Sequence, residues 1–188
     1  MQDERTRYRR AAGERSRLVD VDIPTLETVR LRLVPPVVRH FDAFAATFAD
    51  PSFVVHLKIA PRDRETSHRS FCAMHGHWHF RGWGGFFVEE RASGALVGCV
   101  GLSDWEGWPE PELGWWIVPA AWGRGYAVEG ARAALEYFAS LRRTNRLVSF
   151  VPPDNAPSIR VAEKLGAAHE RDTELHGIPV RVYVHDLA

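Results

Sequence analysis

The sequence has 188 residues, of which 45% are hydrophobic and 26% charged, a composition typical of one folded globular domain. Basic and acidic residues both number 24, so the formal net charge of zero provides no global field for nucleic acid or an anionic membrane. The longest uncharged runs are shorter than the ~20 apolar residues that span a bilayer, which argues against a transmembrane protein.

The first part of the chain differs from the rest. Six arginines occur in residues 1–17, with almost no large apolar side chain. Such a segment cannot bury enough surface to offset the entropy lost on ordering. We therefore expect a mobile arginine-rich arm over 1–24 and a single domain over 25–188.

Apolar periodicity predicts the elements of that domain. They follow in the order strand 28–34, helix 41–48, helix 63–80, strand 86–90, strand 95–102, strand 112–118, helix 126–141, strand 147–151, helix 155–166, strand 170–175 and strand 180–185. Asp50 and Pro51 are expected to stop the first helix. This order predicts a mixed sheet flanked by helices.

The stretch from Glu112 to Glu129 is the most informative, because a strand leads through a glycine-containing loop into the clearest amphipathic helix. Gly123 and Gly125 allow a ligand to approach the backbone, and the free N–H groups at a helix start stabilise phosphate oxygens. Val128 stands where a dinucleotide fingerprint needs a third glycine, and the Lys-Ser/Thr ending of a P-loop is absent. A tight turn without a ligand is the alternative interpretation.

The segment WGRGYA at 122–127 resembles the Q/R-x-x-G-x-G/A acetyl-CoA signature of the GNAT acetyltransferases, with Trp122 in the place of glutamine or arginine. The series ELGWWIVP, WGRGYAVEG and NAPSIRVAEKLGA is similar to the branch that includes the ribosomal-protein N-terminal alanine acetyltransferases. The resemblance implies an α+β GNAT fold. Its mixed, mostly antiparallel sheet would have six to seven strands, a splay between strands four and five, and about four flanking helices.

The same resemblance implies acetyl-CoA as the acetyl donor and no metal. Pantetheine would lie between strands four and five, where backbone groups of Ile117 and Val118 pair with its amides, and residues 123–128 would cradle the pyrophosphate. The implied cofactor-binding residues are Ile117, Val118, Trp122, Gly123, Arg124, Gly125, Tyr126, Ala127, Val128, Asn155 and Ser158.

Direct attack of an amine on the thioester requires a base, because an amine with a pKa near 10 is mostly protonated at neutral pH. Glu112 matches a glutamate common in the branch and is the candidate base. Ser158 is the candidate to protonate the thiolate, since the helix after Asn155 lacks the tyrosine used by many relatives. The alternatives are a strand-edge charge for Glu112 and a helix cap for Ser158. For Glu129, in the first turn of a helix, stabilisation of the helix dipole is expected.

Acidic and aromatic residues precede the Glu112 strand, and they would suit a cationic amine if this connection borders the acceptor cleft. They are Asp104, Trp105, Glu106, Trp108 and Glu110. Trp78 and Trp83 are further candidates for packing on, or lining, the acceptor side. A solvated loop is the alternative. The expected acceptor is an amine-bearing small molecule or a peptide N-terminus, bound by a monomer or homodimer.

The histidines of the second predicted helix and the two cysteines are not expected to bind a metal ion. His75, His77 and His79 have no carboxylate or cysteine at ligand spacing. Cys72 and Cys99 are expected to be buried, reduced thiols in a cytoplasmic protein. The rival function is a module that binds CoA without turnover, which the missing tyrosine favours; nucleic-acid binding is disfavoured by the neutral charge and the absence of a recognition motif.

Overall fold

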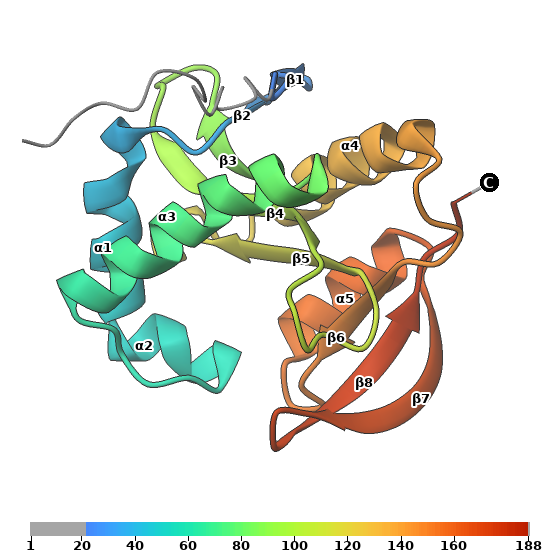
Figure 1. Ribbon diagram of the computed structural model, residues 1–188. Coiled ribbons are helices and arrows are strands. Elements are labelled where there is room, and N and C mark those ends of the chain that lie inside the picture. Colours follow the sequence, from blue (N-terminus) through green and yellow to red (C-terminus); the bar gives the residue numbers. More distant parts are fainter. Residues whose placement is uncertain (1–21, 188) are drawn as a thin grey trace, which may run out of the picture.

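The structure is a computed structural model that describes residues 22–187, so nearly all of the predicted arm lies outside the described residues. One eight-stranded sheet has the order β1-β2-β3-β4-β5-β6-β8-β7, with helices on both faces (Figure 1). Its strands are β1 (Leu26–Glu27), β2 (Leu31–Val34), β3 (Gly85–Glu90), β4 (Leu96–Ser103), β5 (Glu112–Ile117), β6 (Val148–Val151), β7 (Ala168–Leu175) and β8 (Ile178–Val184).

Within residues 22–187, five α-helices and three short 3-10 turns connect the strands. They are η1 (Val38–His40), α1 (Phe41–Ala49), α2 (Pro51–Val54), η2 (Val55–Leu57), α3 (Arg64–Arg81), η3 (Pro119–Ala121), α4 (Tyr126–Leu141) and α5 (Ala156–Lys164). Within residues 22–187, no helix is both long enough and apolar enough to cross a membrane.

The α+β class and the mostly antiparallel sheet are confirmed, but two small elements were missed. The two-residue strand β1 makes the sheet eight-stranded and is too short for a periodic pattern to reveal it. The helix α2 begins at Pro51, where only a helix stop was expected. The Asp50 carboxylate accepts the Ser52 N–H at 2.8 Å, and proline suits a first helical turn, so the same residues both end α1 and start α2.

The sheet is interrupted between β5 and β6. Along β4, β5 pairs antiparallel over its whole length, from Glu112 to Ile117. With β6, β5 is parallel and has a single register pair, Glu112 with Val148. The two strands diverge beyond this pair. Because β1 was not predicted, β5 and β6 are the fourth and fifth strands of the sequence analysis, and the splay predicted between them is confirmed.

Each face of the sheet carries its own apolar core. The face covered by α4 buries side chains of β2 to β5 against Ala131, Ala134 and Leu135. Figure 1 shows α1, α2 and α3 on the opposite face, where most of the buried side chains are aromatic. Its aromatic members include Phe44, Phe48, Phe53, Phe71, Phe87 and the partly buried Trp116. Both cores include residues of β5, so packing on the two faces holds this strand in place beside the splay.

Glu129 fastens the start of α4 to the edge of the sheet. Its carboxylate accepts hydrogen bonds from the Thr28 hydroxyl at 2.6 Å and from the Arg30 backbone N–H at 2.9 Å and Nε at 2.7 Å. Glu129 was expected to stabilise the helix dipole, and its hydrogen bonds also link α4 to the β1–β2 turn. The first backbone N–H groups of α4 are left for another acceptor.

Replacing Phe87, which is fully buried, with alanine should lower the free energy of unfolding by about 3–5 kcal/mol, because it removes a ring from the centre of the aromatic core. Phe80 is 84% exposed, so the matched Phe80→Ala change should stay within about 0.5 kcal/mol of wild type. Denaturant unfolding of both variants measures the difference. Equal losses would contradict this placement of the core.

Candidate active site

The loop before α4 presents a row of unpaired backbone donors. Gly123 and Gly125 have positive φ angles of 74° and 80°, a conformation that glycine adopts without strain. No side chain caps α4, and among the described residues no partner accepts a hydrogen bond from the N–H groups of 123–128. A Cβ added at Gly123 would meet nothing within 4 Å. The loop is an open concave surface suited to an anion.

A cavity of about 390 Å³ runs from this loop into the splay. All of the predicted cofactor residues except Val118 and Arg124 line it. Further walls come from both faces of the sheet: Phe53, His56, Leu57, Trp115, Trp116, Ala121, Pro157, Arg160, Val161 and Lys164. The cavity therefore joins the donor loop to the aromatic face.

Three predicted cofactor residues have other partners. The Val118 N–H donates to the Val97 carbonyl at 2.9 Å, so it points toward β4 and is not free for pantetheine. The Arg124 guanidinium lies 3.7 Å from Glu90, outside the cavity. The Trp122 indole N–H donates to the Ile117 carbonyl at 2.6 Å, which places the indole at the end of β5.

Asn155 and Ser158 face the cavity from the start of α5. The Asn155 side chain accepts the Ser158 N–H at 3.1 Å, as expected of a cap, and also donates to the His56 carbonyl at 3.1 Å. An ion pair between Lys58 and Asp154 adds a second link. The α2–η2 segment is thus tied to α5 across the splay, and Ser158 is held on the cavity wall.

Glu112 lies where the splay begins. Its Oε2 accepts the Trp108 indole N–H at 2.9 Å, and its carboxylate accepts the Phe150 backbone N–H. Burial of the carboxyl group outweighs both bonds and raises the pKa of Glu112 to about 7. On the same face of β5, a Cβ added at Gly114 would meet nothing within 4 Å, so open space separates Glu112 from Trp116.

Comparisons with known proteins agree with this geometry. Residues 30–168 match the family described as Acetyltransferase (GNAT) domain. The chain belongs to this family. It is similar to the crystal structure of an acetyltransferase from Agrobacterium tumefaciens strain C58, with a TM-score of 0.79, 32% identity and coverage of 87% of this chain and 94% of the other.

Two further relatives place this GNAT acetyltransferase more broadly. YkkB, an uncharacterised protein of Bacillus subtilis strain 168, is 29% identical over 74% of this chain and 82% of its own. A ribosomal L7/L12 alpha-N-protein acetyltransferase in complex with coenzyme A has a TM-score of 0.69, and the match covers 87% of this chain.

 The match with that enzyme spans 98% of its chain at 14% identity, a level that shows the shared fold alone.

GNAT acetyltransferases are N-acetyltransferases that use acetyl-CoA as the acetyl donor, and the cavity fits that group. The unpaired N–H groups of 123–128 suit the negatively charged pyrophosphate, while the apolar walls at Ile117 and Val161 suit an uncharged arm. Within the described part of the chain, no group of three His, Cys, Asp or Glu side chains could hold a metal ion.

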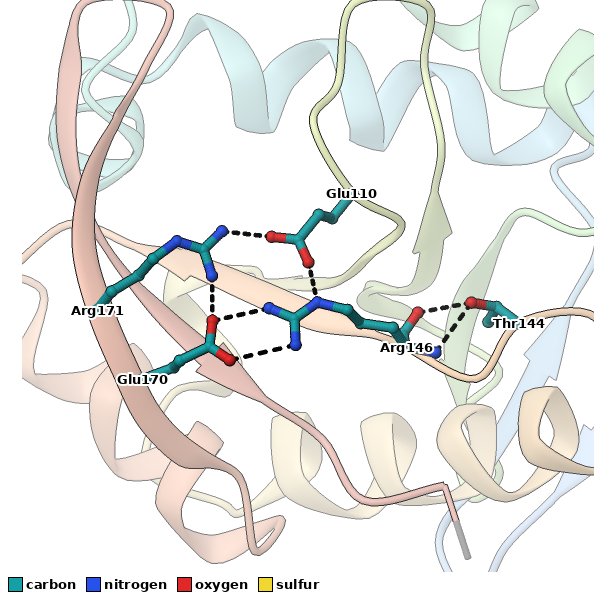
Figure 2. A network of polar contacts seen from close by, with 5 residues as sticks. All are labelled: Glu110, Thr144, Arg146, Glu170 and Arg171. Carbon is teal, nitrogen blue, oxygen red and sulfur yellow. Dashed lines mark hydrogen bonds and ion pairs between the residues drawn. The ribbon is translucent and has the colours of Figure 1, made fainter.

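The acidic loop before β5 does not carry a row of free carboxylates. Glu110 is ion-paired with both Arg146 and Arg171, and these arginines also contact Glu170 (Figure 2). Hydrogen bonds from Arg146 are the main cause of a lowered pKa at Glu110. The network fastens the loop to β7 and to the segment before β6, so Glu110 has a structural role.

Asp104, Trp105 and Glu106 line a separate open hollow against the end of α3. Asp104 lies 3.6 Å from Arg81, and its N–H donates to His77 Nε2 at 3.0 Å. The other ring nitrogen of His77 lies 2.8 Å from the Trp83 carbonyl, so His77 carries its proton on Nδ1 and joins α3 to the loop. These acidic residues are therefore not placed beside Glu112.

Two of the expected acceptor-side tryptophans belong to the core. Trp78 is 1% exposed and donates to the Gly85 carbonyl at 2.9 Å, and Trp83 is also buried. Neither residue lines the cavity, so both are core side chains in this structure, and their contact with the acceptor stays a prediction. Cys99 is buried as expected, whereas Cys72 is exposed on α3.

Sequence reasoning missed the wall formed by Phe53, His56 and Leu57. Their signal was Asp50-Pro51-Ser52, a helix start that was interpreted only as a helix end. Trp108 was expected to contact the acceptor, but its indole N–H is bonded to Glu112 and its ring packs on β6 and β8. Trp108 thus orients the carboxylate.

Gly123→Val should weaken acetyl-CoA binding more than tenfold, because the added side chain would occupy the open surface beside the unpaired N–H groups. Gly94, in the β3–β4 turn, is the matched control, since it has a similar φ of 71° and equally open surroundings. Calorimetric titration of both folded variants with acetyl-CoA compares them. Equal affinities would remove the loop from the binding site.

Proposed function

We propose that this enzyme transfers the acetyl group of acetyl-CoA to a primary amine by direct attack within a ternary complex. The observation that supports this proposal most directly is the raised pKa of the Glu112 carboxyl group. Glu112 does not line the cavity, but it lies on the strand whose other end does, and the open space at Gly114 lies between them. A carboxyl group with a pKa of about 7 in this position has the properties required of a general base at neutral pH.

Acetyl-CoA, when bound, supplies an activated thioester. The Glu112 carboxylate accepts a proton from the ammonium form of the acceptor, directly or through a water molecule, and frees the nitrogen lone pair. That lone pair forms the new C–N bond as the C–S bond breaks. The Ser158 hydroxyl, held on the cavity wall by the Asn155 cap, donates a proton or a hydrogen bond to the departing sulfur.

The charges around the cavity favour an acceptor with one amino group on an uncharged, apolar body. The described lining residues include His56, Arg160 and Lys164 but no carboxylate. Phe53, Trp115 and other aromatic side chains supply apolar walls. A polycationic amine would meet basic groups there, and the acidic groups expected to attract it are paired or lie elsewhere.

Two kinds of acceptor share this chemistry. One is a small aromatic or alkyl monoamine, and the other is a peptide whose N-terminal residue is small and uncharged, as the similarity to the ribosomal-protein alanine acetyltransferase branch suggests. Acetylation of both panels under the same conditions distinguishes them. Release of thiol that depends on the amine also separates an enzyme from a module that only binds CoA.

Glu112→Gln should lower kcat at pH 7 on the order of 10²-fold with little change in acetyl-CoA affinity. In the wild type, kcat at saturating acceptor should rise with pH through about 7, because the ionised carboxylate is the active form. This rise should be absent in the variant. The pH dependence of thiol release measures both effects.

Glu106→Gln is the matched control for that experiment, because Glu106 is an exposed carboxylate in the loop that leads to β5. It should keep the wild-type pH profile. Full turnover by Glu112→Gln with a good acceptor would show that another group, or bulk water, takes the proton.

Gly114→Ala should raise the KM for the acceptor severalfold and leave acetyl-CoA affinity unchanged, because its methyl group enters the space between Glu112 and Trp116. Gly76→Ala is the control, since a Cβ there also meets nothing within 4 Å. With amines of matched pKa, monoamines should exceed polyamines in kcat/KM at least tenfold. A best acceptor that is polycationic, with a KM that rises steeply with salt, would contradict this specificity.

A further inference from the structure

Two side-chain hydrogen bonds replace one backbone bond at the point where β5 and β6 separate. After the Glu112–Val148 pair, a regular parallel ladder would bond the Phe150 N–H to the Leu113 carbonyl. Here the Phe150 N–H donates to the Glu112 carboxylate instead. The Leu113 carbonyl accepts the Ser149 hydroxyl at 2.5 Å. The splay therefore opens without leaving either backbone group unpaired.

His185, the residue that follows β8, contacts the Ser149 hydroxyl. The single proton of the Ser149 hydroxyl is used on Leu113, so the 2.8 Å contact with His185 Nε2 requires the imidazole to donate. His185 is then the Nε2–H tautomer, and its buried Nδ1 has no partner among the described residues. Burial lowers the pKa of His185 to about 4, so the ring is neutral at working pH.

We propose that Ser149 and His185 are positioning residues that keep β5 and β6 apart at Glu112 and thereby give the Phe150 N–H to its carboxylate. The kinetic part of this inference rests on the proposed role of Glu112 as base. Without the Ser149 hydroxyl, the Leu113 carbonyl is free to take the Phe150 N–H back into the ladder. Glu112 then loses a donor that favours its ionised form, and its pKa rises.

The other groups around Glu112 come from the β4–β5 loop, the β7–β8 turn, β4 and β6. Trp108 donates from the β4–β5 loop, and the ring of His176, from the β7–β8 turn, packs on Trp108 at 5.0 Å. Ser103 on β4 and Val148 on β6 are the register partners of Glu112, and Glu110 is held by two arginines. The hydrogen bond from β6 is therefore the contact through which the strand separation acts on the carboxylate.

The test is a pH titration of the Phe150 amide by ¹H–¹⁵N NMR, which requires no turnover. In the wild type the amide proton shift should follow Glu112 with a midpoint near pH 7. In Ser149→Ala this titration should disappear, because the amide bonds to Leu113. The acid limb of the kcat profile should move to higher pH, lowering kcat at pH 7 by about three- to tenfold, with recovery at higher pH.

Ser67→Ala is the matched control, because Ser67 is buried in α3 with no hydrogen-bond partner for its hydroxyl, and the same atom is removed. It should leave both profiles unchanged. Ser149→Cys, a milder change, is measured if Ser149→Ala fails to fold. His185→Gln, which keeps an N–H donor, should lie closer to wild type than His185→Leu.

A Phe150 amide that titrates with an unchanged midpoint in the folded Ser149 variants would overturn the positioning role. The base assignment fails separately, by full turnover of Glu112→Gln. If that variant is fully active while the Phe150 titration still depends on Ser149, the positioning holds and the proposed chemistry does not.

Discussion

A parallel pair of strands that separates after one register pair must satisfy the backbone groups that the missing partner leaves behind. In this protein those groups are satisfied by side chains, and one of these side chains is Glu112. The same interaction that permits the splay thus fixes the orientation of the candidate base. The cavity and the orientation of the candidate base Glu112 both follow from one break in the sheet.

The rest of the fold holds that break open. The aromatic core under α1, α2 and α3 packs against Trp116, and the opposite core packs against Leu113 and Ile117, so β5 is held from both faces. Across the splay, Asn155 and His56 tie α5 to the η2 segment. Because these contacts lie on both sides of the cavity, its walls are formed before any ligand binds.

The features that could be predicted best from the sequence are those that depend on residues close together in the chain. The helix α4 and its loop follow from a regular apolar stripe and from glycines at two positions of positive φ. The cap formed by Asn155 is equally local. These elements carry most of the candidate cofactor site, which explains why the motif resemblance identified it.

Features that depend on distant partners could not be predicted in this way. Glu110 looked like part of an acidic surface because its arginine partners lie 36 and 61 residues further along the chain. Trp78 looked available because nothing in α3 shows that its ring packs on Phe86. The bond from Ser149 to Leu113 likewise joins residues 36 positions apart, so only the folded sheet shows its link to Glu112.

The central claim is that the break in the sheet creates a carboxyl group poised to ionise near neutral pH. The most direct measurement is a ¹³C NMR titration of the Glu112 carboxyl carbon in the wild-type protein, assigned by its loss in the Glu112→Gln spectrum. The structure predicts a midpoint of about 7. A midpoint near the ordinary glutamate value of about 4.3 would contradict the account.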